Sequence, residues 1–177
     1  MNRKLKLWEL ERPTIEEFKE RRKFPITLIL DNIRSLNNVG TFFRTADAFN
    51  VEKIYLCGIT AKPPHREIQK TALGATESVE WEYAESVDDL IVDLKKAGYI
   101  ICAVEQTEQT TFLQDLNVDT SKKYALIMGN EVDGVKQSVI NKADIIIEVP
   151  QFGTKHSLNV SVCAGVVLWE LVRKFTR

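Results

Sequence analysis

The chain has 177 residues, of which 44% are hydrophobic and 28% are charged, and its net charge at pH 7 is −1. This length and composition predict one globular domain with a sizeable core, and no apolar run approaches a membrane span or an export signal. Cys57, Cys102 and Cys163 lie far apart in apolar surroundings, which predicts buried thiols in a reducing, cytoplasmic compartment and excludes a disulfide framework.

The first 24 residues differ in charge from the rest of the chain. They hold eight Lys or Arg and five Glu, a net charge of +3. We expect residues 1–24 to form a basic, helical N-terminal extension. Such an extension can contact the phosphates of a nucleic acid, or it can be a solvated helix whose charged faces pair with each other, and the sequence leaves both readings open.

Short continuous apolar runs recur along the rest of the chain, at residues 26–30, 54–57, 99–104, 124–128 and 145–149. Runs rich in Ile, Leu and Val are typical of parallel strands that are buried on both faces. Residues 78–83 alternate instead, which predicts a strand near an edge of the sheet.

Helical patterns separate several of these strands. Residues 39–49 place their apolar side chains on one helical face, and residues 87–97 form a second amphipathic stretch that ends at Gly98. The alternation predicts an α/β fold with a mostly parallel sheet flanked by helices. A last helix, residues 159–175, is apolar nearly all round, so it is either a deeply packed core helix or part of a homodimer interface.

Several familiar sites are excluded by missing residues. The chain has no G-x-G-x-x-G, no P-loop, no H-E-x-x-H, no cysteine pair at metal spacing and only two histidines. Dinucleotide redox chemistry, nucleotide hydrolysis and a bound metal are therefore not expected.

Three polar segments each follow an apolar strand, and the carboxyl ends of parallel strands form the rim where ligands bind. In residues 30–47, Arg44 projects away from the apolar helical face, toward a cleft or toward a salt bridge with Asp47, and Asn38 can cap the helix. In residues 127–135, Gly129 allows a ligand to approach the backbone and Glu131 follows the strand, although an ordinary turn fits equally.

In the third segment, residues 149–161, a strand ends in a loop with Pro150 and Gly153, and Ser157 or Asn159 then caps the last helix. The three segments together contain Asn38-Val-Gly-x-x-x-Arg44-Thr-Ala-Asp, Met128-Gly-Asn-Glu131 and Ser157-Leu-Asn159-Val-Ser, in this order. They closely resemble the three motifs of the SpoU (TrmH-type) family of RNA ribose methyltransferases. The resemblance spans residues 26–171, and residues 70–75 also resemble the family.

The resemblance implies a SPOUT methyltransferase domain over residues 25–177. Members of this superfamily thread the C-terminal chain through a loop to form a deep trefoil knot, which is close to absent among proteins generally. Members are also homodimers whose active sites form at the subunit interface. Both features are expected here through the resemblance alone.

The family resemblance also implies an activity, the transfer of a methyl group from S-adenosyl-L-methionine to a ribose 2′-hydroxyl of tRNA or rRNA. The cofactor is expected in the knot. The residues expected to hold it, mostly through backbone groups, are Val104, Gly129, Val149, Ser157 and Leu158. The residues expected to act in catalysis are Arg44, Asn38, Glu131, Ser157 and Asn159.

The expected roles follow from the chemistry of each group. We expect Arg44 to act as a fixed cation that stabilises the forming alkoxide, because a guanidinium is a poor general base. Asn38 and Asn159 are expected to bind ribose or phosphate, and Glu131 to orient its polar neighbours. Gln151 departs from the family, which commonly has Met there. The alternatives are an inactive knotted RNA-binding dimer and a methyltransferase for a protein or small molecule.

Overall fold

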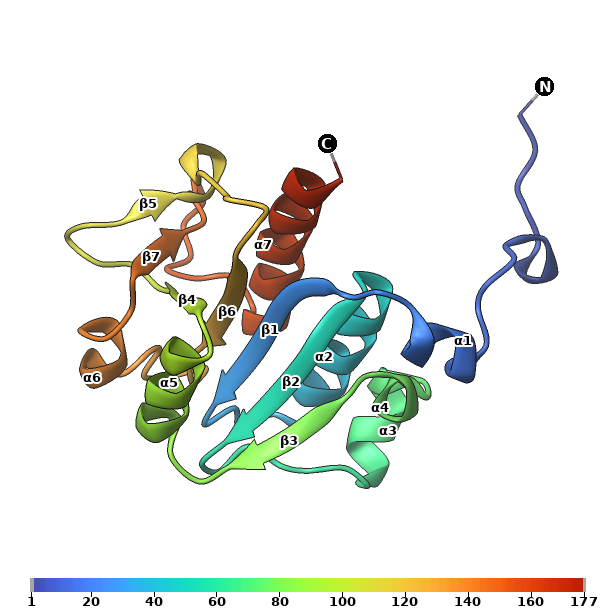
Figure 1. The fold of residues 1–177 in the computed structure, drawn as a ribbon, viewed down its shortest axis with the longest axis horizontal. Helices are drawn as coiled ribbons and strands as arrows, with labels where there is room; N and C mark the ends of the chain where they lie inside the picture. Colours follow the sequence, from blue (N-terminus) through green and yellow to red (C-terminus); the bar gives the residue numbers. More distant parts are fainter. Residues whose placement is uncertain (1, 177) are drawn as a thin grey trace.

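The computed structural model describes residues 2–176, and within them a seven-stranded, wholly parallel sheet has the strand order β3-β2-β1-β6-β4-β7-β5 (Figure 1). The strands are β1 (Phe24–Asp31), β2 (Val51–Cys57), β3 (Trp81–Ala84), β4 (Tyr99–Val104), β5 (Thr111–Phe112), β6 (Lys123–Met128) and β7 (Ile145–Glu148). The helices are η1 (Leu7–Glu9), α1 (Ile15–Glu20), α2 (Leu36–Ala48), α3 (Arg66–Ala72), α4 (Ala75–Ser78), α5 (Val87–Lys96), η2 (Leu113–Asp115), α6 (Gln137–Ile140) and α7 (Val160–Phe175). The predicted α/β class with a parallel sheet is confirmed.

Helices cover the sheet on two faces because buried side chains alternate along its strands. Ile26, Leu28 and Leu30 of β1 belong to the core that α2, α3, α4 and α7 complete. Ile29 points to the opposite face, where α5 and α6 pack. Figure 1 shows α5 and α6 apart from the α2 and α7 layer. Segments far apart in the chain therefore meet at the same sheet edges.

One predicted strand needs correction. Residues 78–83 were expected to be extended, but Ser78 ends helix α4, and the strand runs from Trp81 to Ala84. The amide of Val79 donates to the carbonyl of Ala75 and closes a helical turn that the alternating pattern does not reveal. The expected edge position is confirmed, because β3 is the first strand of the sheet.

Helix α7 buries one face and exposes another. Ala164, Val167, Leu168 and Leu171 are fully buried. In contrast, an apolar stripe of Val162, Val166 and Trp169 is 54%, 40% and 59% exposed, and we call it the α7 stripe. Of the two alternatives for this helix, the deeply packed core helix is therefore not what the structure contains.

Among the described residues, no helix is both long and apolar enough to cross a membrane.

The prediction that the thiols are buried is confirmed for Cys57 and Cys102, whereas Cys163 is half-buried. The boundary after residue 24 and the C-terminal knot stay predictions.

Candidate active site

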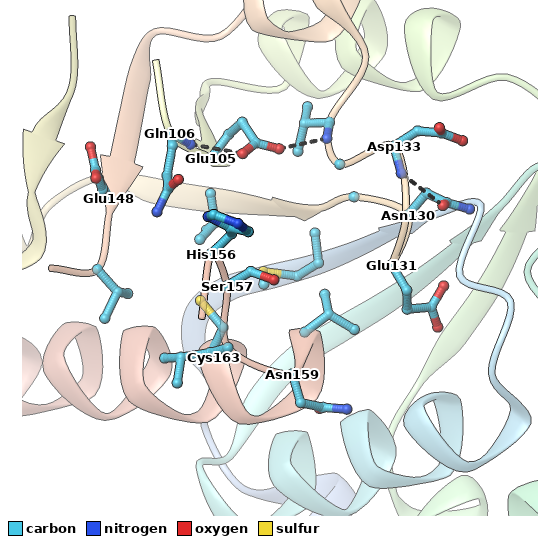
Figure 2. Close-up of a pocket in the computed structure, with 18 of the residues that line it drawn as sticks. Glu105, Gln106, Asn130, Glu131, Asp133, Glu148, His156, Ser157, Asn159 and Cys163 are labelled. Atoms are coloured by element: carbon cyan, nitrogen blue, oxygen red, sulfur yellow. Dashed lines mark hydrogen bonds between the residues drawn. The ribbon is translucent and has the colours of Figure 1, made fainter. Parts of the chain in front are cut away.

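A cavity of about 630 Å³ lies where β4, β6 and β7 end, at the rim expected for ligands (Figure 2). Each of the five residues predicted to hold the cofactor lines it: Val104, Gly129, Val149, Ser157 and Leu158. Glu131 and Asn159 line it as well. Two of the three motif segments therefore converge on one cavity.

The lining of this cavity is acidic. It includes the carboxylates of Glu105, Glu131, Asp133 and Glu148, and no Lys or Arg of the described chain lines it. Carboxylates without cations nearby favour a positively charged ligand. Residues 2–176 contain no group of three or more His, Cys, Asp or Glu placed to hold a metal ion.

Residues 129–135, which we call the Glu131 loop, form a tight turn at the cavity wall. The amides of Asn130 and Gly134 donate to each other's carbonyl oxygens at 3.1 and 3.0 Å. Gly134 has φ +66°, and Gly129 lies so close to the backbone of Gly134 that a Cβ would collide with it. Both glycines are required by this packing, because other residues rarely adopt such a φ or need more room.

Glu105, which sequence reasoning missed, fastens this loop to the end of β4. Its carboxylate accepts hydrogen bonds from the amide of Val135 at 2.8 Å and of Gln106 at 2.8 Å (Figure 2). A Cβ on Gly134 would collide with the same carboxylate. The available signal was an acid directly after a predicted strand, at the rim where the other polar segments were found.

The Glu131 carboxylate joins the loop to the start of α2. It accepts hydrogen bonds from the amides of Arg34 and Ser35, both at 2.9 Å, and from Nδ2 of Asn38 at 3.0 Å. Burial raises the pKa of Glu131, but these hydrogen bonds to the ionised form outweigh burial and hold its pKa below the ordinary value. Glu131 therefore orients neighbouring polar groups while ionised.

Asn38 does not cap helix α2, contrary to the expectation that it can. Ser35 is the cap, because its hydroxyl accepts from the amide of Asn38 at 3.3 Å. The buried Asn38 side chain instead accepts at Oδ1 from Nδ2 of Asn159 at 3.1 Å and from the Ser161 hydroxyl at 3.4 Å. Asn159, not Ser157, caps α7. Glu131, Asn38 and Asn159 thus form one hydrogen-bonded chain across three motifs.

Arg44 lies apart from this chain of hydrogen bonds. Its side chain is exposed on α2 and does not line the cavity. Within the described part of the chain it has no hydrogen bond or ion pair, and Asp47, its expected alternative partner, accepts from the Ser78 hydroxyl. One copy of the polypeptide therefore brings Asn38, Glu131, Ser157 and Asn159 to the cavity region but leaves Arg44 on the surface.

The chain is similar in sequence to known proteins. The model of the SpoU rRNA Methylase family matches residues 25–169. The chain is 33% identical over 150 residues to a 23S rRNA (guanosine-2′-O-)-methyltransferase of Neisseria meningitidis, covering 85% of this chain and 59% of the relative. It is 30% identical over 166 residues to a tRNA (guanosine(18)-2′-O)-methyltransferase of Aquifex aeolicus, covering 90% of this chain and 74% of that one.

Solved structures share the fold. A TrmH/SpoU tRNA modifying enzyme of A. aeolicus superposes with a TM-score of 0.80 at 28% identity, covering 90% of this chain and 80% of that one. An AdoMet-bound rRNA methyltransferase of Sinorhizobium meliloti gives a TM-score of 0.80 at 28% identity, covering 86% and 57%. The chain spans 59% to 63% of the length of several curated relatives that it matches. Because the family model matches most of its length, the chain belongs to the SpoU rRNA methylase family.

Proposed function

We propose that this chain transfers a methyl group from S-adenosyl-L-methionine to a ribose 2′-hydroxyl of tRNA or rRNA. The observation that carries the proposal is the hydrogen-bonded chain from Glu131 through Asn38 to Asn159, which ties the three motif segments together at the cavity. Relatives named as ribose methyltransferases of both RNA classes support it.

The cavity suits S-adenosyl-L-methionine in size and charge. About 630 Å³ falls within the roughly 300–1,000 Å³ of small-molecule sites. The cofactor has a sulfonium, an ammonium and one carboxylate, so it is a net cation, and four carboxylates line the cavity. We propose that backbone groups near Val104, Gly129, Val149 and Leu158 hold it, with Ser157 beside it. Bound there, the cofactor supplies a methyl group on a positively charged sulfur.

The α7 stripe supports a homodimer. Val162, Val166 and Trp169 follow one another at helical spacing and leave an apolar surface exposed. We propose that the stripe packs against its copy on a second chain around a twofold axis.

Helix α2 borders this stripe. The Phe49 ring, just past the end of α2, lies 6.3 Å from the Trp169 ring, and the Thr45 methyl group lies next to Gly165. Arg44 adjoins Thr45 and is exposed. We therefore propose that Arg44 acts at the cavity of the partner chain, which gives a reason for its distance from its own cavity.

At that site Arg44 acts as a fixed cation. A guanidinium stays protonated near neutral pH, so it binds an RNA phosphate and stabilises the forming alkoxide while the proton leaves to phosphate or water. Asn38 and Asn159 already make hydrogen bonds to protein groups, so we assign them to positioning rather than to ribose contact. Orientation of the hydroxyl toward the methyl group supplies much of the rate.

Methyl-labelled S-adenosyl-L-methionine tests the proposal when the purified protein is incubated with separate tRNA and rRNA fractions. The label should enter ribonuclease-sensitive material, and the modified linkage should resist alkaline cleavage because its 2′-oxygen is blocked. Label in alkali-sensitive linkages, in protein, or nowhere would contradict ribose methylation.

A further inference from the structure

We propose that residues 2–14, which we call the arm, bind unpaired RNA by stacking a nucleobase on Trp8 and by contacting phosphates with Lys4, Lys6 and Arg12. The proposal rests on the proposed function only in taking RNA as the substrate. Figure 1 shows the arm extending from α1 away from the sheet. The arm is therefore open to a long, flexible ligand.

The distribution of charge is the first argument. The whole chain carries −1 and residues 1–24 contribute +3, so residues 25–177 carry −4. The domain that holds the acidic cavity therefore repels a polyanion on average. RNA binding depends strongly on phosphate contacts with Lys and Arg. Residues 2–14 hold four Lys or Arg and two Glu, so the arm adds cations to a domain that is acidic on average.

Trp8 is the second argument. Its side chain is 77% exposed, while the other tryptophans are more covered. The ion pair of Arg3 with Glu9 at 2.6 Å and the hydrogen bond from the Lys6 amide to Glu9 at 2.7 Å fold the short turn η1 around Glu9. The Lys6 ammonium nitrogen, Nζ, lies over the Trp8 ring, 5.0 Å from its centre. An open indole beside an ammonium is a stacking platform for a base next to its phosphate.

The position of the arm is the third argument. The arm continues into α1, whose Phe18 packs into the core that α2 shares. Helix α1, from which the arm extends, and α2, which carries Arg44, thus pack on the same face of the sheet. An RNA that reaches Arg44 therefore approaches from the side on which the arm is anchored.

Binding of a twelve-nucleotide oligouridine and of a blunt RNA duplex of equal length tests the arm, followed by tryptophan fluorescence in the full chain. Oligouridine should bind more tightly and quench the fluorescence. Trp8→Ala should weaken oligouridine binding about tenfold, and Trp8→Phe should stay within about twofold because it keeps an aromatic face. Equal affinity of Trp8→Ala and the wild type would overturn the stacking role.

Salt dependence tests the charged side chains. Replacing Lys4, Lys6 and Arg12 together by Gln should reduce the slope of log affinity against log salt by about two, since each single-strand phosphate contact contributes about 0.7. The matched control is Lys95→Gln with Lys96→Gln on α5, on the opposite face, which should leave the slope unchanged. An unchanged slope in the arm variant would exclude the phosphate contacts.

Two further results separate the proposals. If Trp8→Ala changed the oligomeric state in sedimentation without changing oligouridine affinity, the arm would bind a second copy and the inference would be wrong. If the wild type methylated RNA but the arm variants bound it normally, only the arm proposal would fail. If the arm bound RNA but no methyl group were transferred, the proposed function would fail alone.

Discussion

Glu131 accepts a hydrogen bond at 3.0 Å from Nδ2 of Asn38, a residue 93 positions earlier in the chain. The same carboxylate accepts from the amides of Arg34 and Ser35, so it satisfies backbone donors at the start of α2 that the helix itself leaves unpaired. Glu131 therefore holds the start of α2, the helix that also carries Arg44. Hydrogen bonds from one end of α2 thus lead to Glu131 at the cavity wall, while Arg44 lies on the surface of the same helix.

Glu131→Gln should weaken this connection. A Gln amide directs hydrogens toward at least one of the three donors, so we expect a loss of about 1 kcal/mol in the free energy of unfolding at neutral pH. Methyl transfer should fall more than cofactor affinity, because the start of α2 is released while the cavity keeps its glycines. The matched control is Glu108→Gln, the same change at an exposed acid that does not line the cavity. Urea unfolding and single-turnover methyl transfer measure the two effects.

The pH dependence of the same variant has a definite sign. The folded-state pKa of Glu131 is lowered, so its stabilisation is complete above the unfolded value of about 4.3 and is lost as pH falls through the folded value. The difference in stability between wild type and Glu131→Gln should therefore shrink below about pH 4. A difference that stayed constant down to lower pH would show that the charge of Glu131 contributes nothing.

Gly134→Ala should disturb the Glu131 loop. At φ +66° an alanine is strained by about 1 kcal/mol, and its Cβ would displace the Glu105 carboxylate from the Val135 amide. We expect about tenfold weaker cofactor binding in calorimetry. Gly153→Ala is the control, since nothing lies within 4 Å of its Cβ position. Equal affinities in the two variants would mean that the loop does not shape the cofactor site.

Five of the seven strands could be predicted directly, because five continuous apolar runs report burial on both faces. The two-residue strand β5 was not predicted. The sequence also located the polar segments, since each directly follows such a run. It did not predict α3, α4 and α6, which have seven, four and four residues and complete too few turns for a helical period to appear.

The connections inside the site were beyond local pattern. The sequence suggests two roles for Asn38, a helix cap and a contact to ribose or phosphate. Ser35 is the cap, and Asn38 bridges Glu131 and Asn159. Asn38 and Asn159 are 121 positions apart, so their contact exists only because α2, the Glu131 loop and α7 pack together in the folded chain. Glu105 was overlooked for the same reason, because its partner Val135 is 30 positions away.

Val166→Glu should separate the proposed dimer. It places a charge in the centre of the α7 stripe, where burial of an unpaired carboxylate is strongly unfavourable. We expect a monomer in analytical ultracentrifugation, with cofactor affinity retained and methyl transfer lost. Val92→Glu on α5 is a matched control, because Val92 is 45% and Val166 40% exposed. A dimer that persisted in Val166→Glu would place the interface elsewhere.

Arg44→Lys separates a fixed cation from a titrating base. Lysine keeps the charge but loses the planar fork that binds a phosphate at two points, so single-turnover methyl transfer should fall about tenfold or more at every pH, with an unchanged pH profile. Full activity with a new, lower pH optimum would instead support a base at this position.

Mixed dimers test whether Arg44 serves the cavity of its partner. One parent is Arg44→Ala, and the other is Ser157→Trp, whose indole fills the cofactor cavity that Ser157 lines. If Arg44 acts across the interface, each mixed dimer pairs an intact cavity with an intact Arg44 of the other chain, and random reassociation should restore about a quarter of wild-type activity. If Arg44 acts within its own chain, every cavity in the mixture lacks one of the two elements and the mixture stays as inactive as its parents. Cofactor binding by the Arg44→Ala parent shows beforehand that its cavity is intact, so a silent mixture would point to the wrong assignment of Arg44 rather than to misfolding.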